Sequence, residues 1–595
     1  MLKKNLLESI NNPHLFQKDL IDIQNLSIRF NKLKKKEFNF KKKINISISS
    51  DYTTNYLVEL LPLFLANHKI DCTLSETDFG SLNFLSHDLN NSFWKGKLDL
   101  FLLIPSSKNL KYLPKLGDDL KKIKKNAKRD ADFWLKVWSN TKKNIIQTTF
   151  DPIQETNFGQ LDGVKFGGYL HYIRLVNSIL IENLPSNVDL IDIEGLIIKN
   201  KKAKWNDNKI YNLTKQPCSM DTLPFFAKNI CTLVSGTLGL SKKVVILDLD
   251  NTLWGGIIGD DGLDGIVLGE ETAEGQAFIH FQKYLKNLSH KGIILCVCSK
   301  NDVNVAKEVF NKHPHMYLKL KDISLFIANY NNKADNIKKI SKTLNLNLDS
   351  FVFLDDSKIE CELVKNKLPE VMTINLDYDP SEFVENLELI SPFYFNKITK
   401  EDLDRVNSYE KIHLMNNEKS ESKNLDDFLK NLKSEVSLEK IDNSNKDRSS
   451  QLIAKTNQFK LNLKQFSPIN LLQKREKCIP ISFKDKYQNY GIIGVLVYDI
   501  NKKLNTLLID NWVMSCRVFS RRLENYLIEI LINKAKKLDL KYISFNFVLS
   551  DKNIYLQNFL NELGFKISKK NINYSININK IPNSKKHYIS SKRTK

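Results

Sequence analysis

The chain of 595 residues is long enough for about three or four domains. Its hydrophobic content of 42% is that of a folded protein and excludes a largely disordered one, and no apolar run is long enough to cross a bilayer. The formal charge of +22 is mostly a general excess of Lys. Because these lysines are not interleaved with stacking aromatics, we expect no nucleic-acid binding, whereas an acidic protein partner fits the charge.

Residues 1–43 are predicted to form a basic helical segment. The segment carries acidic residues and has no small-residue cleavage site, so we expect no signal peptide and a cytoplasmic protein. The eight cysteines are then expected to be reduced thiols, and they show neither a Cys-x-x-Cys pair nor zinc-ligand spacing. Cys296 and Cys298, two apart in a predicted strand, should point to one face of the core.

Residues 44–200 alternate between predicted strands and helices, which indicates a doubly wound parallel sheet. This domain resembles SGNH and flavodoxin-like domains. The expected strands are 44–50, 71–76, 98–105, 144–149 and 188–197, and the expected helices are 53–67, 113–143 and 166–183. Ser49, Ser50 and Asp51 follow the first strand, where a hydrolase nucleophile could lie. The chain has no Gly-x-Ser-x-Gly elbow and no late Asp-x-x-His pair, so a docking or scaffold domain is favoured.

Residues 201–242 are predicted to be a connector, with a helix from about Asp221. Trp205, Tyr211 and Pro217 are apolar residues in this otherwise polar stretch. We expect them to pack at an interface between domains.

The most informative stretch is Lys243 to Gly256, "KVVILDLDNTLWGG", which begins the predicted third domain at 243–395. A run of β-branched residues indicates a buried parallel strand, and Asp248 and Asp250 follow at its end. Acids at the carboxyl end of such a strand lie where open α/β sheets bind ligands. Two carboxylates at this spacing can share a hard cation and still leave one oxygen free to attack phosphorus.

Three further elements of this predicted domain end or begin with a polar side chain. The strand within 292–300 ends in Ser299 and is followed by Asn301, Lys333 opens a helix, and a strand from about 349 ends in Asp355 and Asp356. One Asp-x-Asp is a weak signal. Four elements in this order, each at a strand end or helix start of one sheet, are a strong one.

These motifs resemble the haloacid dehalogenase (HAD) superfamily of phosphohydrolases, and more closely its FkbH-like subgroup, class IIIC. The matching segments are "DLDNTLWGG", "GDDG", "CSKN", the lysine at 333 and the acid pair "DD". Flanking segments "KQPCSMDTLP", "AKTNQFKLN", "DNWVMSCRVFSRRLE" and "FLNELGF" also resemble that subgroup, so the resemblance runs from about residue 44 to 566. It implies a Rossmann-like HAD core between two other domains.

The pattern assigns a role to each polar residue. Asp248 is the expected nucleophile, Asp250 the general acid and base, Ser299 a donor to phosphoryl oxygens, and Lys333 the cation that neutralises charge. We expect Mg²⁺ to be held by the four aspartates, with Asp250 acting through its carbonyl and Asp356 the likelier direct ligand of its pair. The list of expected phosphate-binding residues in this domain is Thr252, Gly255 and Asn301.

The spacing of the motifs leaves no room for a large cap domain. The interval before Ser299 is filled by one Gly-rich flap, one helix at 273–290 and one strand, and the interval after it by core helices. An uncapped site is open to large substrates, such as a group carried on another protein.

After a linker at 396–424, residues 425–585 are predicted to form an α+β domain, followed by a basic tail at 586–595. The expected elements are antiparallel strands within 477–485, 490–500 and 504–515, a helix at 521–538, a strand at 542–549 and a final helix before Gly564. This layout resembles the N-acetyltransferase (GNAT) fold. In active acetyltransferases a Gly-containing loop holds the pyrophosphate of coenzyme A.

In this chain the corresponding loop, 517–522, has Ser520 and Arg522 where the family has glycines. Arg517 and Arg521 are expected to bind phosphate by their side chains, from coenzyme A or from a carrier-bound phosphopantetheine. Cys516, beside these arginines, is either a thioester relay or a core residue. Asn457 and Gln458 are expected to line a cleft between domains.

The FkbH-like resemblance implies an enzyme that takes a three-carbon unit from 1,3-bisphosphoglycerate, removes phosphate and loads the glyceryl group onto an acyl carrier protein. Three alternatives stay open. They are a HAD phosphatase with accessory domains, an acyltransferase of surface polysaccharide or secondary-metabolite biosynthesis, and a catalytically silent docking scaffold. The oligomeric state is not determined by the sequence.

Overall fold

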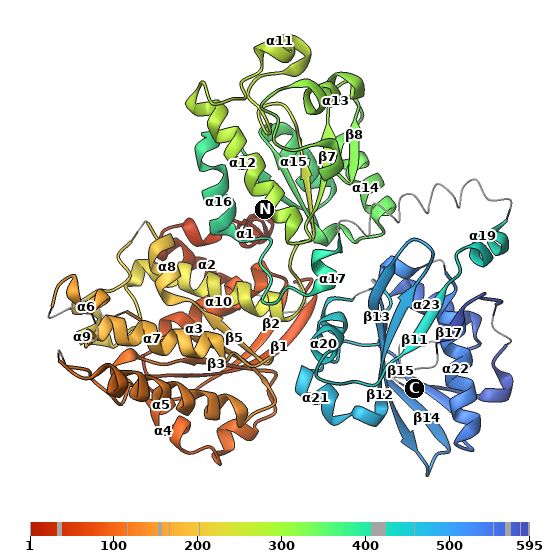
Figure 1. Ribbon diagram of the computed structural model, residues 1–595, viewed down its shortest axis with the longest axis horizontal. Coiled ribbons are helices and arrows are strands. Elements are labelled where there is room, and N and C mark those ends of the chain that lie inside the picture. Colours follow the sequence, from red (N-terminus) through yellow and green to blue (C-terminus); the bar gives the residue numbers. More distant parts are fainter. Residues whose placement is uncertain are drawn as a thin grey trace. The chain divides into compact units, whose positions relative to one another are not determined.

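The computed structural model describes residues 2–32, 38–115, 117–152, 158–165, 167–201, 203–405, 424–456, 458–519, 521–550, 553–565, 573–582 and 585–592. The chain divides into two compact units, Met1–Leu238 and Gly239–Lys595, and each is taken by itself below. Within the described residues three sheets form the framework, one in the first unit and two in the second (Figure 1).

The first unit is built on a five-stranded sheet of order β2-β1-β3-β4-β5, in which every neighbouring pair is parallel. This is the doubly wound order with its switch point between β1 and β3, so the predicted fold class is confirmed. The strands are β1 (Lys42–Ser50), β2 (Ile70–Glu76), β3 (Leu100–Ile104), β4 (Asn144–Thr148) and β5 (Val188–Ile191). The helices between them are α3 (Asn55–Asn67), α4 (Ser81–His87), α5 (Leu120–Ser139), α6 (Leu161–Val164) and α7 (Tyr169–Glu182).

The predicted last strand of this sheet was too long. It stops at Ile191, and the rest of the predicted stretch forms helix α8 (Ile193–Lys199). The apolar run "IDIEGLI" fits either period, so its composition alone does not decide between strand and helix. Here the backbone leaves the sheet at Asp192, where the N–H of Ile193 is held by the Thr149 hydroxyl.

The helical segment and the connector both pack onto this unit. Helices α1 (Leu2–Ile10) and α2 (Leu20–Lys32) contact α3, and so does α10 (Leu223–Thr237), which also contacts β4 and β5. The ring of Trp205 packs edge to face against that of Phe226, and the ring of Tyr211 packs in the same way against that of Tyr52. These connector aromatics, like the short helix α9 (Asn208–Thr214), therefore pack inside the first unit and not at an interface between domains, because α10 completes one face of the N-terminal sheet.

The second unit begins with a five-stranded sheet of order β10-β9-β6-β7-β8, again all parallel, as predicted for a HAD core. The strands are β6 (Val244–Leu247), β7 (Ile294–Ser299), β8 (Leu325–Ala328), β9 (Phe351–Asp355) and β10 (Met372–Asn375). The helices are α11 (Ile258–Gly265), α12 (Ala273–His290), α13 (Val303–Lys312), α14 (Lys333–Leu344), α15 (Lys358–Lys367), α16 (Phe383–Ile390) and α17 (Lys400–Leu403).

One apolar cluster fixes α14 and α15 on a single face of this sheet. Cys296 and Cys298 are fully buried in it, as predicted, together with Ile337 of α14 and Val364 of α15. Alternate strand residues such as Val245 point to the other face, where α12 contacts β7 and α16. The sheet is thus covered on both faces, which leaves its two edges of strand ends as the places for ligands.

The last sheet of the second unit is mixed, with the order β16-β15-β14-β13-β12-β11-β17. Its strands are β11 (Glu435–Leu438), β12 (Cys478–Lys484), β13 (Asn489–Asn501), β14 (Thr506–Met514), β15 (Tyr542–Asn546), β16 (Asn573–Asn577) and β17 (Ser590–Lys592). The three central antiparallel strands and the helix before β15 follow the GNAT-like prediction. The helices are α19 (Leu425–Asn431), α20 (Lys446–Lys455), α21 (Pro468–Gln473), α22 (Leu523–Lys537) and α23 (Ile554–Glu562).

Two expectations for this domain need correction. The predicted basic tail is partly structural, because Ser590–Lys592 pairs in parallel with β11 and adds an edge strand. The strand expected to reach residue 549 ends at Asn546, where the Asn462 side chain takes up the carbonyl of Asn546. Most of the predicted linker, residues 406–423, lies outside the described residues.

Candidate active site

The candidate active site lies at the carboxyl ends of three adjacent strands, β9, β6 and β7. Asp248 directly follows β6, Ser299 is the last residue of β7, and Asp355 is the last residue of β9. Lys333 opens α14, whose N-cap Asn332 accepts the N–H of Ala334. Because parallel strands bring their carboxyl ends to one edge, the four predicted elements meet.

Three carboxylates form one cluster there. Oxygens of Asp248, Asp355 and Asp356 all lie within 4.8 Å of one another. Lys333 Nζ lies 3.0 Å from Asp248 Oδ2 and 2.6 Å from Asp355 Oδ2, and it is only 3% exposed. The other oxygen of Asp248, Oδ1, is buried and has no partner at hydrogen-bond geometry among the described residues, although the Ser299 hydroxyl and the Leu249 N–H lie close enough to lower the pKa of this carboxyl group. Oδ2 of Asp248 is therefore held by the Lys333 cation, while Oδ1 is available to contact a ligand.

Burial and mutual repulsion make these carboxylates hard to ionise. Burial raises the pKa of Asp248, against the attraction of Lys333. Burial and the nearby Asp248 raise the pKa of Asp355 to about 7. Burial tends to lower the pKa of Lys333, but its attraction to Asp248 and Asp355 outweighs this and holds that pKa above its usual range. A cluster with three acids and one cation favours a second positive charge.

The donor set fits a hard divalent cation. Both side-chain oxygens of Asp355 are in use, since Oδ2 accepts from Lys333 and Oδ1 accepts the N–H of Ser357 at 2.9 Å. Asp356 lies beside them, half-buried, with its pKa raised by burial and by Asp248. The buried, unpartnered Oδ1 of Asp248 and the carboxylate of Asp356 thus supply oxygen ligands of the kind that Mg²⁺ prefers.

Asp250 is oriented by three donors. Its Oδ1 accepts the indole N–H of Trp254 and the N–H of Ile258, each at 3.0 Å. Its Oδ2 accepts Asn301 Nδ2 at 2.8 Å, and the same amide lies 3.1 Å from the Ser299 hydroxyl. Asn301 therefore positions Asp250 and Ser299 together. We did not single out Trp254 from the sequence, although it lies inside the motif, because its role depends on the turn that brings it back to Asp250.

The other two predicted phosphate ligands of this domain differ from one another. Thr252 is fully buried, and its hydroxyl has no partner among the described residues. Gly255, by contrast, uses its N–H and its carbonyl in a bridge to Val267, so its backbone is not available to phosphate. A Cβ at Gly255 would lie 3.1 Å from that of Val267 and 2.9 Å from Glu274 Oε1, so this glycine allows close packing at the base of the flap.

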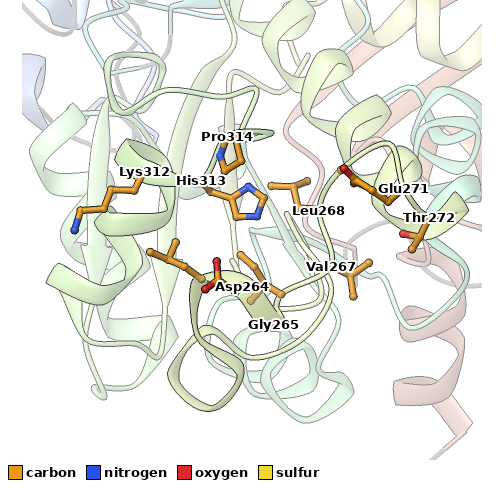
Figure 2. Close-up of a pocket in the computed structure, with 12 residues that line it drawn as sticks. Asp264, Gly265, Val267, Leu268, Glu271, Thr272, Lys312, His313 and Pro314 are labelled. Carbon is orange, nitrogen blue, oxygen red and sulfur yellow. The ribbon is translucent and has the colours of Figure 1, made fainter.

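No domain is inserted over the strand ends within residues 203–405. Between β6 and β7 the chain makes only the flap with α11, followed by α12. A pocket of about 460 Å³ lies beside the flap and is lined by residues 263–269, 271–272 and 312–314. Figure 2 shows the His313 ring projecting into this pocket. None of its lining residues belongs to the carboxylate cluster, so this pocket is a separate feature.

Cys516 lies at the opposite edge of the same sheet. Its carbonyl accepts Asn345 Nδ2 at 3.5 Å, and its side chain packs against the cluster that contains the starts of β6 and β9. A strand rises about 3.3 Å per residue, so the five steps from Lys243 to Asp248 put these edges about 16 Å apart. A thioester relay at Cys516 would therefore act at a distance from the carboxylate cluster, and it stays a prediction.

Arg521, one of the two arginines predicted to bind phosphate, is used inside the C-terminal domain, and so is its neighbour Arg522. Arg521 is 1% exposed, pairs with Asp485 at 3.2 Å and donates to the carbonyl of Arg517 and the hydroxyl of Tyr490. Arg522 pairs with Asp426 at 2.7 Å. Arg521 is thus a core residue and not a phosphate ligand, because the loop folds its guanidinium inward. Ser520 lies outside the described residues.

The remaining candidates fall elsewhere. Gln458 donates to Asn347 at 3.1 Å and, with Arg517, lines a cavity considered further below, while Asn457 lies outside the described residues. In the first unit, the Ser50 hydroxyl donates to the carbonyl of Ile104, and the Asp51 carboxylate accepts the N–H groups of Ser106 and Asn83. These side chains close loops, in keeping with a non-catalytic domain.

Comparisons with known proteins agree with this architecture. Residues 45–235 match the family model described as "FkbH, N-terminal domain". The N-terminal part of the protein BF1531 from Bacteroides fragilis, "containing phosphatase domain complexed with Mg", is 28% identical, with a TM-score of 0.58 over 64% of this chain and 100% of that one. No curated protein sequence matches the chain significantly.

Two acetyltransferase structures are also similar in part. The ribosomal-protein-S18-alanine N-acetyltransferase from Escherichia coli is 11% identical, with a TM-score of 0.18 over 24% of this chain and 89% of its own. A Bacillus subtilis acetyltransferase in complex with CoA is 18% identical, with a TM-score of 0.17 over 23% of this chain and 78% of its own. We attach no functional meaning to these likenesses.

Fold and site together define a protein with a HAD-type phosphatase domain, set between an N-terminal α/β domain and a GNAT-like one. More particularly, residues 45–235 match the FkbH N-terminal domain, and 64% of the chain is similar to the phosphatase-domain structure from Bacteroides fragilis. None of the helices in the described part of the chain combines the length and apolar character that crossing a membrane requires.

Proposed function

We propose that this protein is a Mg²⁺-dependent phosphoryl-transfer enzyme that uses Asp248 as its nucleophile. The observation that carries the proposal is the state of the Asp248 carboxylate, with Oδ2 beside Lys333 and Oδ1 buried without a hydrogen-bond partner among the described residues. A buried carboxylate oxygen without a donor is costly in a purely structural role. It fits an oxygen that meets a cation or a phosphoryl group.

Each residue of the site then has a task. Asp248 attacks phosphorus and forms an aspartyl-phosphate while Asp250, held by Asn301 and Trp254, protonates the leaving oxygen. Asp250 next removes a proton from the water that hydrolyses the intermediate. Ser299 donates to phosphoryl oxygens, and Lys333 balances the charge that builds up on them.

Asp248, Asp356 and the Asp250 carbonyl would hold Mg²⁺, with Lys333 and Ser357 fixing the neighbouring Asp355. The metal, when bound, offsets negative charge on the phosphoryl oxygens.

For the substrate we propose 1,3-bisphosphoglycerate, and for the acceptor the phosphopantetheine thiol of an acyl carrier protein. The carrier thiol attacks the acyl carbon and displaces inorganic phosphate to form the thioester, and the phosphate ester at the other end is hydrolysed at Asp248. Three observations support this assignment, namely the FkbH-like N-terminal domain, the absence of an inserted cap within residues 203–405, and a net charge that suits an acidic carrier. We place the reaction in the cytoplasm.

The test is to incubate the full chain with 1,3-bisphosphoglycerate, Mg²⁺ and a phosphopantetheinylated carrier, and to measure phosphate release and the mass of the carrier. We expect Mg²⁺-dependent phosphate release and a glyceryl adduct on the carrier. In Asp248→Asn the ester phosphate should stay on the acyl group, so that the carrier gains a phosphoglyceryl adduct instead of a glyceryl one. The matched control is Asp335→Asn, the same change on an exposed residue of α14, which should behave like the unaltered protein. Phosphate release without an adduct would leave a HAD phosphatase. Release of the ester phosphate by Asp248→Asn at the normal rate would refute both proposals.

A further inference from the structure

A second polar cavity lies at the amino edge of the HAD sheet, where the linker and the C-terminal domain meet it. It has a volume of about 100 Å³. Its walls come from the residue before β6, the loop before β9, the linker after α17, helix α20 and the end of β14. Such a cavity has room for a few water molecules or for a small ion.

The charged side chains that line this cavity are strongly unbalanced. There are five cationic residues and one carboxylate, Asp402, and the cationic residues are Lys243, Arg405, Arg448, Lys455 and Arg517. Asp402 forms ion pairs with Arg405 and, at 3.3 Å, with Lys455, and it also accepts from Gln451. One carboxylate cannot balance five cations, and buried charge of one sign is costly unless an opposite charge joins it.

The cations reach the cavity from separate elements. Arg405 also donates to the carbonyl of Gly292 at 2.8 Å, and Arg448 donates to Gln451 at 2.6 Å and to the carbonyl of Ile492. The partners named here are neutral, so these hydrogen bonds hold the guanidinium groups in place without reducing their charge. A rigid set of donors arriving from several directions suits an anion with several oxygens better than a single carboxylate.

The ionisation of Lys455 agrees with this charge imbalance. Its side chain is 12% exposed. Burial lowers its pKa to about 7, and repulsion from Arg405, Lys243 and Arg448 adds to this against the attraction of Asp402. An anion in the cavity would oppose both causes and return the proton to Lys455.

We propose that this cavity is a binding site for a phosphate-type oxyanion, distinct from the magnesium-dependent site at the other edge of the sheet. The anion joins the HAD domain, the linker and the GNAT-like domain through Lys243, Arg405, Arg448 and Lys455. Its source is either free inorganic phosphate or the phosphate of a larger molecule such as coenzyme A, and the same cations would recognise both.

The test is calorimetric titration of the full chain with inorganic phosphate in a buffer that contains a chelator and no Mg²⁺. Without the metal, the acidic cluster at the other edge repels phosphate, so the titration reports on the cationic cavity. We expect binding that Arg448→Gln weakens at least about tenfold, because one charge-assisted donor is lost. Lys464→Gln, which removes one positive charge from a surface pair with Asp510 in the same domain, is the matched control and should bind normally.

Two further arms sharpen the result. Asp248→Asn should bind phosphate unchanged, so that failure of the proposed catalysis and failure of this site are distinguishable. Coenzyme A is titrated in parallel. If coenzyme A binds and Arg448→Gln weakens that binding, the site belongs to a larger phosphate compound. If only inorganic phosphate binds, the site belongs to the free ion.

A proton readout completes the design. At pH 8, phosphate binding should take up a fraction of a proton, measured in buffers of different ionisation enthalpy, and Lys455→Gln should abolish that uptake. Lys243→Gln replaces Arg448→Gln if the latter variant does not fold, as judged by circular dichroism. The proposal is overturned if neither phosphate nor coenzyme A binds the metal-free protein, or if the cavity variants bind as tightly as Lys464→Gln.

Discussion

The two edges of the HAD sheet carry opposite charge. At the carboxyl edge, Asp248, Asp355 and Asp356 surround the single cation Lys333. At the amino edge, five cations surround the single carboxylate Asp402. The same four-residue strand, β6, connects them, with Lys243 before it and Asp248 after it. One sheet therefore offers a site suited to a cation at one end and a site suited to an anion at the other.

A sheet that is packed by helices on both faces can accommodate charged side chains only at the ends of its strands. Strand β6 itself is wholly apolar and fully buried. Backbone groups and side chains become accessible only where the strand stops, and the neighbouring loops decide which charges gather there. The predictions below test whether the two edges act independently.

The largest effect is expected for Asp248→Asn. The amide keeps the shape of the side chain but is a poor nucleophile, so phosphate release should fall by at least about 10³-fold. Steady-state rates with Mg²⁺ and an aryl phosphate measure this, and phosphate binding at the amino edge should not change. A variant with more than a tenth of the original rate would remove Asp248 from the mechanism.

Lys333→Met comes next. Removing this cation leaves Asp248 and Asp355 without their charge partner, so the rate should fall by about 10²-fold to 10³-fold. The control is Lys300→Met, which removes an exposed lysine that pairs with the half-buried Glu360, and its rate should stay within about twofold. If the two lysine variants lose the same activity, the carboxyl edge does not depend on a buried cation.

Asp402→Asn tests the amino edge. It removes the carboxylate that pairs with Arg405 and Lys455, so the free energy of unfolding should fall by about 3 kcal/mol. Affinity for phosphate should rise, because the cavity becomes more positive, while the phosphate-release rate per folded molecule stays unchanged. Urea unfolding and phosphate titration measure the two effects, and a loss of phosphate affinity would contradict the electrostatic argument.

The smallest effect is on the pH dependence of stability in metal-free buffer. The folded chain keeps the Asp355 proton up to about pH 7, whereas the unfolded chain loses it near pH 4, so this group makes stability fall between those values. The folded chain loses the Lys455 proton near pH 7, whereas the unfolded chain keeps it to about pH 10, so this group makes stability rise over that range.

Each slope should be at most about 1.4 kcal/mol per pH unit. Urea unfolding at a series of pH values should show that Asp355→Asn removes the falling limb and Lys455→Met the rising one. Mg²⁺ should flatten only the falling limb, and phosphate only the rising one. Removal of both limbs by either variant would show that the two edges are coupled.

The sequence by itself determined the carboxyl edge. An apolar strand run followed by Asp248 and Asp250, then Ser299, Lys333 and the pair Asp355–Asp356, is enough because strand order and parallel pairing bring these ends together without further information. It also determined the fold class of all three sheets, since hydrophobic periodicity records which residues face a core.

Only the tertiary structure decided what lies at the other edge. Lys243, Asp402 and Lys455 are separated by more than 200 residues of chain between the first and the last, and nothing local marks them as neighbours. The folding back of Arg521 onto Asp485 and Tyr490, the packing of Cys516 away from Asp248, and the use of the Gly255 backbone by Val267 are likewise long-range contacts. A motif at a strand end can be recognised in the sequence, because its residues lie next to an apolar run of known periodicity. A site formed by packing between distant loops cannot, because the side chains that meet there share no sequence pattern.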